Sequence, residues 1–115
     1  MSEKTKSPLP DDALVVRGGT NIPKTVARGF GNHPSGVIGV SVECAVDAEL
    51  LELALELAHY RQIGVTTVGE VRAMGGDVIR TSGRSENHAT LTGLTADVIS
   101  SLLNPTLPNP AHGTG

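Results

Sequence analysis

The chain has 115 residues, the usual length of one compact domain, which leaves no room for a second core. Hydrophobic residues make up 38% of it but aromatic residues only 2%, so the core must be aliphatic and a base-stacking surface for single-stranded nucleic acid is not expected. The net charge of −3, without any basic run, argues further against nucleic acid as a stable partner.

Both ends are expected to be flexible tails around a single domain over residues 13–103. Residues 1–12 are polar and carry prolines, and residues 104–115 contain three prolines and two glycines, which interrupt helices and strand ladders. The N-terminal tail has no apolar stretch that could act as a secretory signal or a membrane span. Because Cys44 is the sole cysteine, no internal disulfide can form. These features predict a cytoplasmic protein that does not associate with membranes.

The first part of the domain is expected to hold two strands. The apolar run over 13–16 predicts a buried strand that ends in a glycine-containing turn at 17–20. A short helix can begin after Pro23, which suits the first helical position. The β-branched segment over 37–42, with Ser41 between two valines, predicts the second strand.

Two helices are expected in the middle of the chain. The first runs from an Asp47 N-cap to residue 58, and its glutamates fall on one solvated stripe while leucines cover the rest of its surface. After an apolar piece at 63–65, Thr67 and Glu70 match a capping box that begins the second helix. A pair of glycines ends that helix.

The last part of the domain is expected to form a hairpin and a helix. The segments 77–81 and 88–92 alternate polar and apolar side chains, and the polar link between them suits an antiparallel pair. Thr95 then caps a helix that runs to residue 103. The predicted order is β-β-α-α-β-β-α, which describes a small mixed α+β domain with short strands.

The turn after the first strand is the first candidate binding feature. Arg17 can hold a phosphate or a carboxylate through two parallel hydrogen bonds, and Gly18 and Gly19 let a ligand approach the backbone. The alternative is a purely structural turn, in which the glycines adopt positive φ and Arg17 is solvated or pairs with Asp11 or Asp12. The pattern matches neither of the two nucleotide-binding glycine motifs.

His88 and Thr90 are the second candidate feature, because alternate residues of one strand share a face. A histidine beside a hydroxyl can perform acid–base work and bind an oxyanion. As H-x-T, the pair resembles one half of the 2H phosphoesterase signature, and His33-Pro34-Ser35 offers a second half. That resemblance implies a phosphodiesterase or RNase-type toxin that uses His88. The structural alternative is a half-buried histidine bonded to neighbouring backbone.

No metal site is expected. The four histidines do not follow the H-x-x-x-H or H-x-x-E-H spacing of zinc-binding helices, and a lone cysteine offers no thiolate pair. Ser41 and Cys44 have no recognisable base near them in sequence, so neither is assigned as a nucleophile.

An arginine-glycine strand end, a serine-bearing second strand and a long helix, all within residues 13–60, together resemble the NAD-binding front half of small ADP-ribosyltransferase toxin domains. The resemblance implies NAD as cofactor, with Arg17 and Ser41 contacting nicotinamide and phosphate. It leaves His88 or Glu86 as late catalytic residues. The family's acidic residue on a late strand has no clear counterpart, because Glu86 falls in the predicted hairpin link.

Residues 63–110 also have the general character of small bacterial toxin and mobile-element proteins. The leading hypothesis is therefore a toxin-like bacterial enzyme of the ADP-ribosyltransferase type that binds a phosphate-containing nucleotide such as NAD. Its expected ligand contacts are Arg17, Gly18, Gly19 and Ser41. Its expected catalytic residues are His88, Arg17 and Thr90.

Two other functions stay open on sequence grounds. One is an RNase-type toxin in which His88 acts on a phosphate held by Arg17, although the acidic composition weakens it. The other is a non-enzymatic immunity or antitoxin-type protein, for which acidity and a glutamate stripe are suitable. If the chain is itself the toxin, a cognate antitoxin or immunity protein is its expected partner.

Overall fold

The computed structural model of this chain describes residues 9–32, 36–83 and 85–113. Most of the expected N-terminal tail and the segment His33-Pro34-Ser35 lie outside these ranges, so the structure does not test either prediction. Within them, no helix combines the length and the apolar character needed to cross a bilayer.

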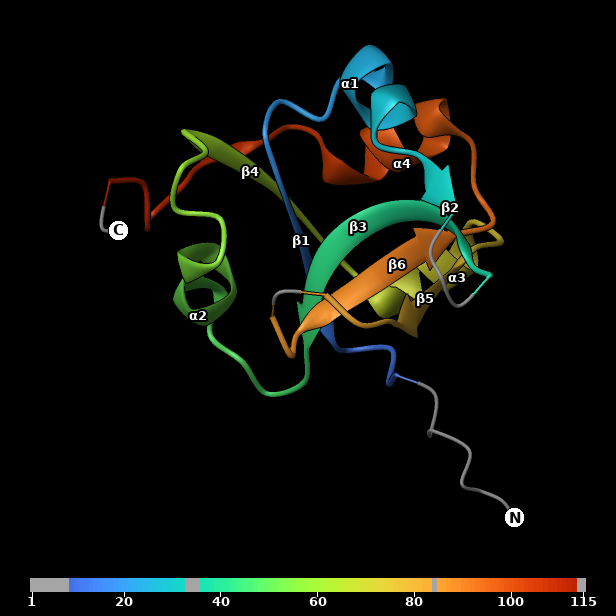
Figure 1. Ribbon diagram of the computed structural model, residues 1–115, viewed down its shortest axis with the longest axis horizontal. Helices are drawn as coiled ribbons and strands as arrows, with labels where there is room; N and C mark the ends of the chain where they lie inside the picture. The colour runs from blue at the N-terminus through green and yellow to red at the C-terminus, as the bar shows by residue number, and fades with distance from the viewer. Residues whose placement is uncertain (1–8, 33–35, 84, 114–115) are drawn as a thin grey trace.

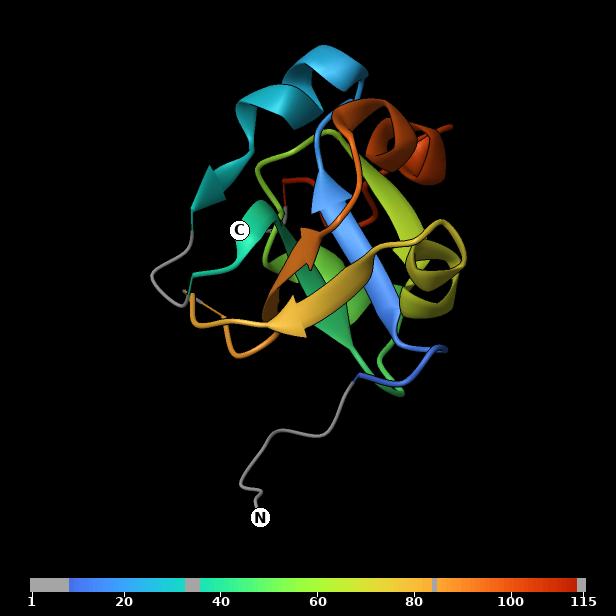
Figure 2. The same ribbon diagram turned by 90° about the vertical axis from the view of Figure 1, so that its right-hand side faces the viewer.

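The described residues form a seven-stranded antiparallel sheet with four helices packed on it (Figures 1 and 2). The strand order is β5-β6-β3-β1-β4-β7, and β2 pairs with β3. The predicted mixed α+β class is confirmed, and the predicted order matches roughly. In chain order the elements are β1 (Leu14–Gly18), α1 (Pro23–Arg28), β2 (Gly31–Asn32), β3 (Ile38–Ala45), α2 (Leu50–Leu55), β4 (Gln62–Thr67), α3 (Val68–Ala73), β5 (Asp77–Arg80), β6 (His88–Thr92), α4 (Ala96–Leu103) and β7 (Leu107–Pro108).

The helix expected over 47–58 is shorter than predicted, because α2 covers only Leu50–Leu55. Its N-cap is Glu49, whose side chain forms a reciprocal capping box with Glu52. Asp47 adopts φ 53°, outside the extended conformation that an N-cap residue takes, so it cannot cap the helix. The turn that follows α2 carries Tyr60 beside the end of β1.

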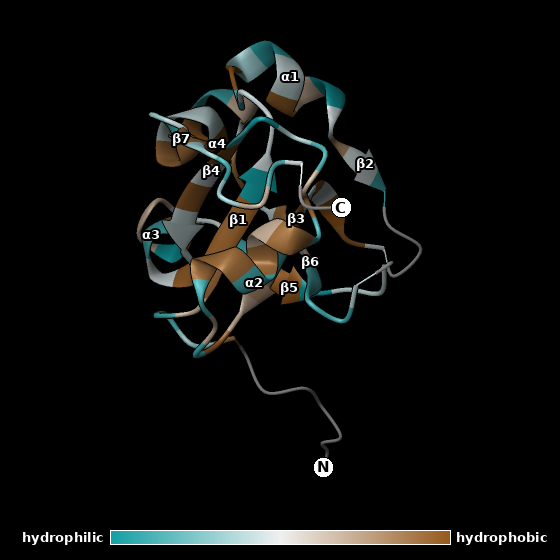
Figure 3. Ribbon diagram, turned by 90° about the vertical axis from the view of Figure 1, so that its left-hand side faces the viewer, coloured by the Kyte–Doolittle hydropathy of each residue, from teal (hydrophilic) through white to brown (hydrophobic). Residues whose placement is uncertain are grey.

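The sheet separates two clusters of buried side chains. On one face α1, α3 and α4 cover the strands, and on the other α2 lies over β1 and β3 (Figure 3). The first cluster includes Val15, Val26, Val40, Val42, Val71, Ile99 and Leu103. The second includes Val16, Leu53, Ala54, Ile63 and Ala111. Alternate residues of β1 and β3 therefore serve opposite faces.

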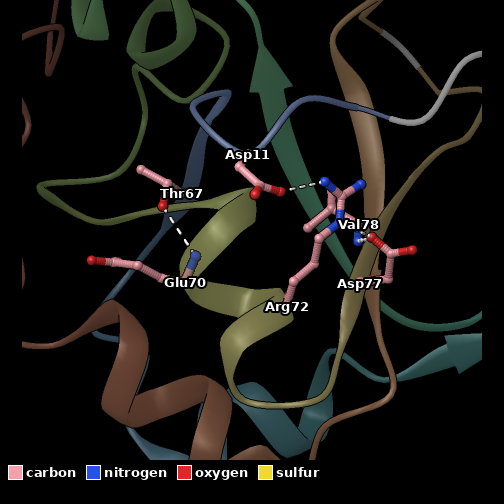
Figure 4. Close-up of polar contacts among 6 residues, drawn as sticks. All are labelled: Asp11, Thr67, Glu70, Arg72, Asp77 and Val78. Carbon is pink, nitrogen blue, oxygen red and sulfur yellow. Dashed lines mark hydrogen bonds and ion pairs between the residues drawn. The ribbon is translucent and has the colours of Figure 1, made fainter.

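Thr67 caps the N-terminal end of α3 as predicted, but the Glu70 side chain does not complete the predicted capping box (Figure 4). Thr67 accepts a hydrogen bond from the backbone amide of Glu70 at 3.2 Å. The Glu70 carboxylate accepts instead from the hydroxyl of Thr66 at 2.6 Å, and thereby fixes the end of β4 to the helix.

Arg72 on α3 joins two other segments to the helix (Figure 4). Its Nη1 lies 2.6 Å from Oδ1 of Asp11, which precedes β1, and its Nε lies 3.0 Å from Oδ1 of Asp77 at the start of β5. These two carboxylates raise the pKa of Arg72 by hydrogen bonding to its guanidinium. The structure thus pairs Asp11 with Arg72 and not with Arg17, which was the pairing considered for a purely structural turn.

Residues 104–113, assigned to a C-terminal tail from the sequence, pack onto the domain. β7 pairs with the start of β4, and Ala111 is fully buried. The side-chain amide of Asn104 donates to the backbone oxygen of Asn21 at 2.9 Å. Side-chain amides therefore supply hydrogen bonds that a proline-rich backbone lacks.

Candidate functional site

β1 and β3 run side by side and then separate. Their pairing ends at Val16↔Glu43, beyond which β1 continues beside β4 and β3 continues beside β6. Where they separate lies a cavity of about 150 Å³. The residues that line it come from β1, from β3 and from the turn after α2, and they are Val16, Arg17, Gly18, Ser41, Val42, Glu43, Leu57 and Tyr60.

Three residues that the sequence assigned to a ligand meet at this cavity, namely Arg17, Gly18 and Ser41. Gly19 follows them at the strand end with φ 97°, a conformation that favours glycine. That a nucleotide binds there stays a prediction.

The missing side chain of Gly18 makes room for an aromatic ring of the protein itself. A Cβ atom at Gly18 would overlap the ring of Tyr60, and one at Gly19 would lie 3.8 Å from the same ring. The ring of His59, an exposed residue, lies at a centroid distance of 4.1 Å from the Tyr60 ring. Gly18 therefore seats the Tyr60 wall of the cavity, which is a different role from the ligand approach expected of it.

The guanidinium of Arg17 is directed at the turn after β1. Its Nη1 donates to Oδ1 of Asn21 at 2.6 Å, and its Nη2 lies against Gly29 at the end of α1. The buried Asn21 amide in turn donates to the backbone oxygens of Arg17 at 3.0 Å and of Gly19 at 3.1 Å. Burial lowers the pKa of Arg17, and the influence of Tyr60 opposes that shift. Arg17 thus ties its turn together through Asn21.

Strand alternation separates Arg17 from the other candidate residues. Val16 and Glu43 face each other across β1 and β3, and Glu43 and His88 do so across β3 and β6, so these three share one face. Arg17, next to Val16 in the strand, points to the opposite face. The leading hypothesis expects the Arg17 guanidinium and the His88 imidazole to meet at one ligand. The structure instead places them on opposite faces of the sheet.

Glu43 also lines this cavity, although no sequence motif indicates it as a site residue. Its residue is only 8% exposed, and its Oε1 is buried without a hydrogen-bond partner among the described residues. Its strand position beside Ser41, two residues away on the same face, is the signal that could have identified it. Its burial depends on the strands to either side of β3, which the sequence does not specify.

Burial is also the main electrostatic influence on Glu43, and it raises the pKa of the carboxyl group. A hydrogen bond from Ser85 lowers it, Glu56 adds a smaller upward influence, and His88 and Arg80 oppose the shift with their positive charge. The net shift is upward, so the Glu43 carboxyl stays protonated to a higher pH than an ordinary glutamate does.

His88 and Thr90 lie on β6 next to the cavity residues of β3. Their cross-strand partners are Glu43 and Ser41 respectively, so all four side chains lie on one face, as alternation predicts. The hydroxyl of Thr81 lies 2.9 Å from both His88 Nδ1 and Thr90 Oγ1. This bridge fixes the orientation of the imidazole beside Glu43.

Cys44 and the acidic side chains of α2 are the remaining candidates for covalent or metal chemistry. Cys44 is fully buried, and burial raises the pKa of its thiol to about 11, so it is a poor nucleophile. Among the residues described, no three of the side chains that bind metals lie close enough together to hold an ion. The glutamates expected on a solvated stripe, Glu49, Glu52 and Glu56, are exposed.

The two walls of the cavity offer different chemistry. β3 contributes the Ser41 hydroxyl and the Glu43 carboxyl, whereas Leu57 and Tyr60 contribute apolar surface. Such walls suit a flat group with one polar edge, which can stack on the ring while its edge forms hydrogen bonds.

No family model matches this chain, and no curated protein or solved structure matches it either.

Proposed function

We propose that this domain binds a nucleotide by taking one ring-bearing part of it, a ribose or a base, into the cavity between β1 and β3, and that Glu43 exchanges a proton with that part. The observation that carries the proposal is the buried Glu43 carboxyl at the cavity wall, with an oxygen that has no partner among the described residues. A buried polar atom without a hydrogen bond is costly, and a bound ligand or water is the usual remedy.

The size of the cavity limits the part of a ligand that can enter. Its volume of about 150 Å³ is well below that of pockets which enclose a drug-sized molecule, roughly 300–1,000 Å³. One ring with its substituents is therefore the expected occupant. The rest of the ligand would remain outside the cavity.

NAD, which the family resemblance implies, fits this residue set in one of its rings. Ser41 and Glu43 are the residues that would hold the hydroxyl or amide groups on such a ring, and Tyr60 would contact its face. When bound, NAD supplies an activated glycosidic bond for group transfer. Arg17 is not part of this hold, because its guanidinium is bonded to Asn21 on the other side of the sheet.

Glu43 and His88 together suit general acid–base chemistry. Burial raises the pKa of Glu43 and so moves it toward cellular pH. A carboxyl is most effective at both accepting and donating a proton when its pKa lies near the working pH. His88 lies directly across on β6, where the Thr81 hydroxyl holds its imidazole beside Glu43. The RNase-type alternative has weaker support, because it needs Arg17 and His88 on the same phosphate.

Tyr60 provides the test, because the chain has one tyrosine and no tryptophan, so its intrinsic fluorescence reports on the cavity wall alone. We expect NAD and ADP-ribose to change this fluorescence, and inorganic phosphate to leave it unchanged. Titration calorimetry would give the affinities. Glu43→Gln is expected to weaken NAD binding about tenfold, the effect of losing roughly 1.4 kcal/mol of interaction.

Glu86→Gln is the matched control, because Glu86 is exposed and is the acidic residue that the family resemblance would have selected. It should bind NAD like the wild type. The proposal is wrong if neither nucleotide alters Tyr60 fluorescence or produces heat, or if Glu43→Gln and Glu86→Gln bind NAD equally well.

The toxin-like role has a separate test. Expression of the wild-type chain in a bacterial host is expected to slow growth, and Glu43→Gln to restore it. Normal growth with the wild type would instead favour the immunity or antitoxin-type alternative, in which the chain protects rather than harms.

A further inference from the structure

The C-terminal segment 107–113 lies against the turn that brings Leu57 and Tyr60 to the cavity. The side-chain amide of Asn109 donates to the backbone oxygens of both residues, at 2.9 Å in each case. The backbone amide of Asn109 donates to the oxygen of Arg61, also at 2.9 Å. Segments separated by about fifty positions in the chain are thereby joined at the cavity wall.

Asn109 is suited to this contact by its burial and by its full set of hydrogen bonds. It is only 7% exposed, and its Oδ1 accepts from the amide of Ala111 at 2.9 Å while its Nδ2 serves the turn. Ala111 is fully buried in the same cluster as Val16 and Leu53, so the segment itself is fixed to the sheet. The backbone carbonyls that Asn109 holds follow the end of α2, where the Leu57 oxygen also accepts from the Tyr60 amide at 3.0 Å.

We propose that Asn109 is a positioning residue for the ligand site, which makes the C-terminal segment a part of that site. Asn109 holds the turn so that the Tyr60 ring stays over Gly18 and forms the cavity wall. The inference rests on the proposed function for its effect on ligand binding, but the effect on Tyr60 itself is independent of any ligand.

Specificity follows from the same contact. Tyr60 is 37% exposed, and its ring lies against the Gly18–Gly19 backbone and beside the ring of His59. Without the Asn109 bonds the ring would be free to leave Gly18, and the cavity would widen. A fixed ring therefore sets the size of the group that the site admits.

Acrylamide quenching of Tyr60 fluorescence tests the positioning role without a ligand. In Asn109→Ala the quenching constant is expected to rise roughly twofold, because local opening exposes the ring without unfolding the domain. His112→Ala is the matched control, since His112 is a nearby exposed residue of the same segment, and it should quench like the wild type. Circular dichroism checks that both variants remain folded.

NAD affinity, measured by calorimetry, tests the link to the site. It is expected to fall about tenfold in Asn109→Ala and to stay unchanged in His112→Ala. If NAD binds no form of the protein while quenching still distinguishes Asn109→Ala, the proposed function fails and the positioning role stands. If NAD binds the wild type and Asn109→Ala alike, or if quenching is the same in both, the positioning role is overturned.

A measurement on the unaltered protein covers the case in which Asn109→Ala does not fold. The side-chain amide protons of Asn109 give their own nuclear magnetic resonance signals, and NAD is expected to shift them together with those of the Tyr60 backbone. Shifts at Ser41 and Glu43 with none at Asn109 would contradict the inference.

Discussion

The two faces of the sheet differ in what covers them, and β3 shows the difference within one strand. Val40, Val42 and Cys44 point to the face under α1, α3 and α4, where they are buried in a continuous apolar cluster. Ser41 and Glu43 point to the other face, where α2 is the helix that packs on β1 and β3. Ser41 stays exposed there.

This contrast suggests that the first face supplies most of the folding free energy and that the second carries the chemistry. Apolar burial is the dominant favourable contribution to folding, whereas a buried carboxyl oxygen without a hydrogen-bond partner works against it. Substitutions on the two faces should therefore separate stability from ligand binding.

The largest effect is expected from Ile99→Ala on the covered face. Ile99 on α4 is fully buried, so the truncated side chain leaves a cavity and the free energy of unfolding should fall by about 2–5 kcal/mol. Urea denaturation followed by circular dichroism measures the change. Ser41→Ala, on the other face, should cost less than about 0.5 kcal/mol, as exposed positions usually do. Similar losses for both would remove the contrast between the faces.

Gly18→Ala is expected to have the next largest effect, because it attacks the seat of the Tyr60 ring. The added methyl group overlaps that ring, and overpacking of this kind costs roughly 1–3 kcal/mol. Tyr60 fluorescence should change at the same time. Gly31→Ala is the control, since a Cβ atom there meets nothing within 4 Å. If a Tyr60→Ala background does not relieve the cost of Gly18→Ala, the overlap is not its cause.

Local sequence patterns predicted those strands and helix starts that depend on neighbouring residues alone. Apolar runs marked β1 and β3, and the N-caps Thr67 and Thr95 mark the starts of α3 and α4 as expected. The helix start at Glu49 was missed because the choice between Asp47 and Glu49 depends on backbone conformation, which residue type alone does not fix.

The site was harder to predict because it depends on strand register and on distant segments. Arg17 and Gly18, at the end of β1, and Ser41, within β3, line one cavity, but their assignment to a ligand stays a prediction. The separation of Arg17 from His88 follows only from the pairing of β1, β3 and β6, which single residues do not encode. The role of Asn109 could not be predicted, because a segment with several prolines has no helix or strand pattern from which a contact with a distant turn could be inferred.

Arg17→Ala should have a moderate effect on stability and a small one on ligand binding. The substitution removes the bond to the buried Asn21, whose φ of 53° the turn must maintain, so the free energy of unfolding should fall by about 1–2 kcal/mol. NAD affinity, measured by calorimetry on folded protein, should change less than about threefold. A loss of affinity without a loss of stability would restore Arg17 to the phosphate-binding role that the sequence suggested.

The smallest expected effect is a pH dependence that Glu43 alone should produce. Because burial raises the pKa of Glu43 in the folded state, the group is protonated in both states below its unfolded pKa of about 4.3, and its contribution to stability is complete there. As the pH rises through the folded pKa, the unfolded chain has already released this proton, so the wild type loses stability.

Glu43→Gln cannot titrate, and the comparison with it isolates this contribution. As the pH rises above about 4.3, the wild type should therefore lose stability relative to Glu43→Gln until the pH has passed the raised folded pKa, as measured by urea denaturation at a series of pH values. Glu86→Gln, at an exposed position, should follow the wild type throughout. A ligand whose hydrogen bonds satisfy the ionised Glu43 carboxylate would flatten the same difference, because it would offset the cost of burying that charge. A difference that stays constant across the range without ligand would mean that the Glu43 carboxyl is not buried in the folded protein.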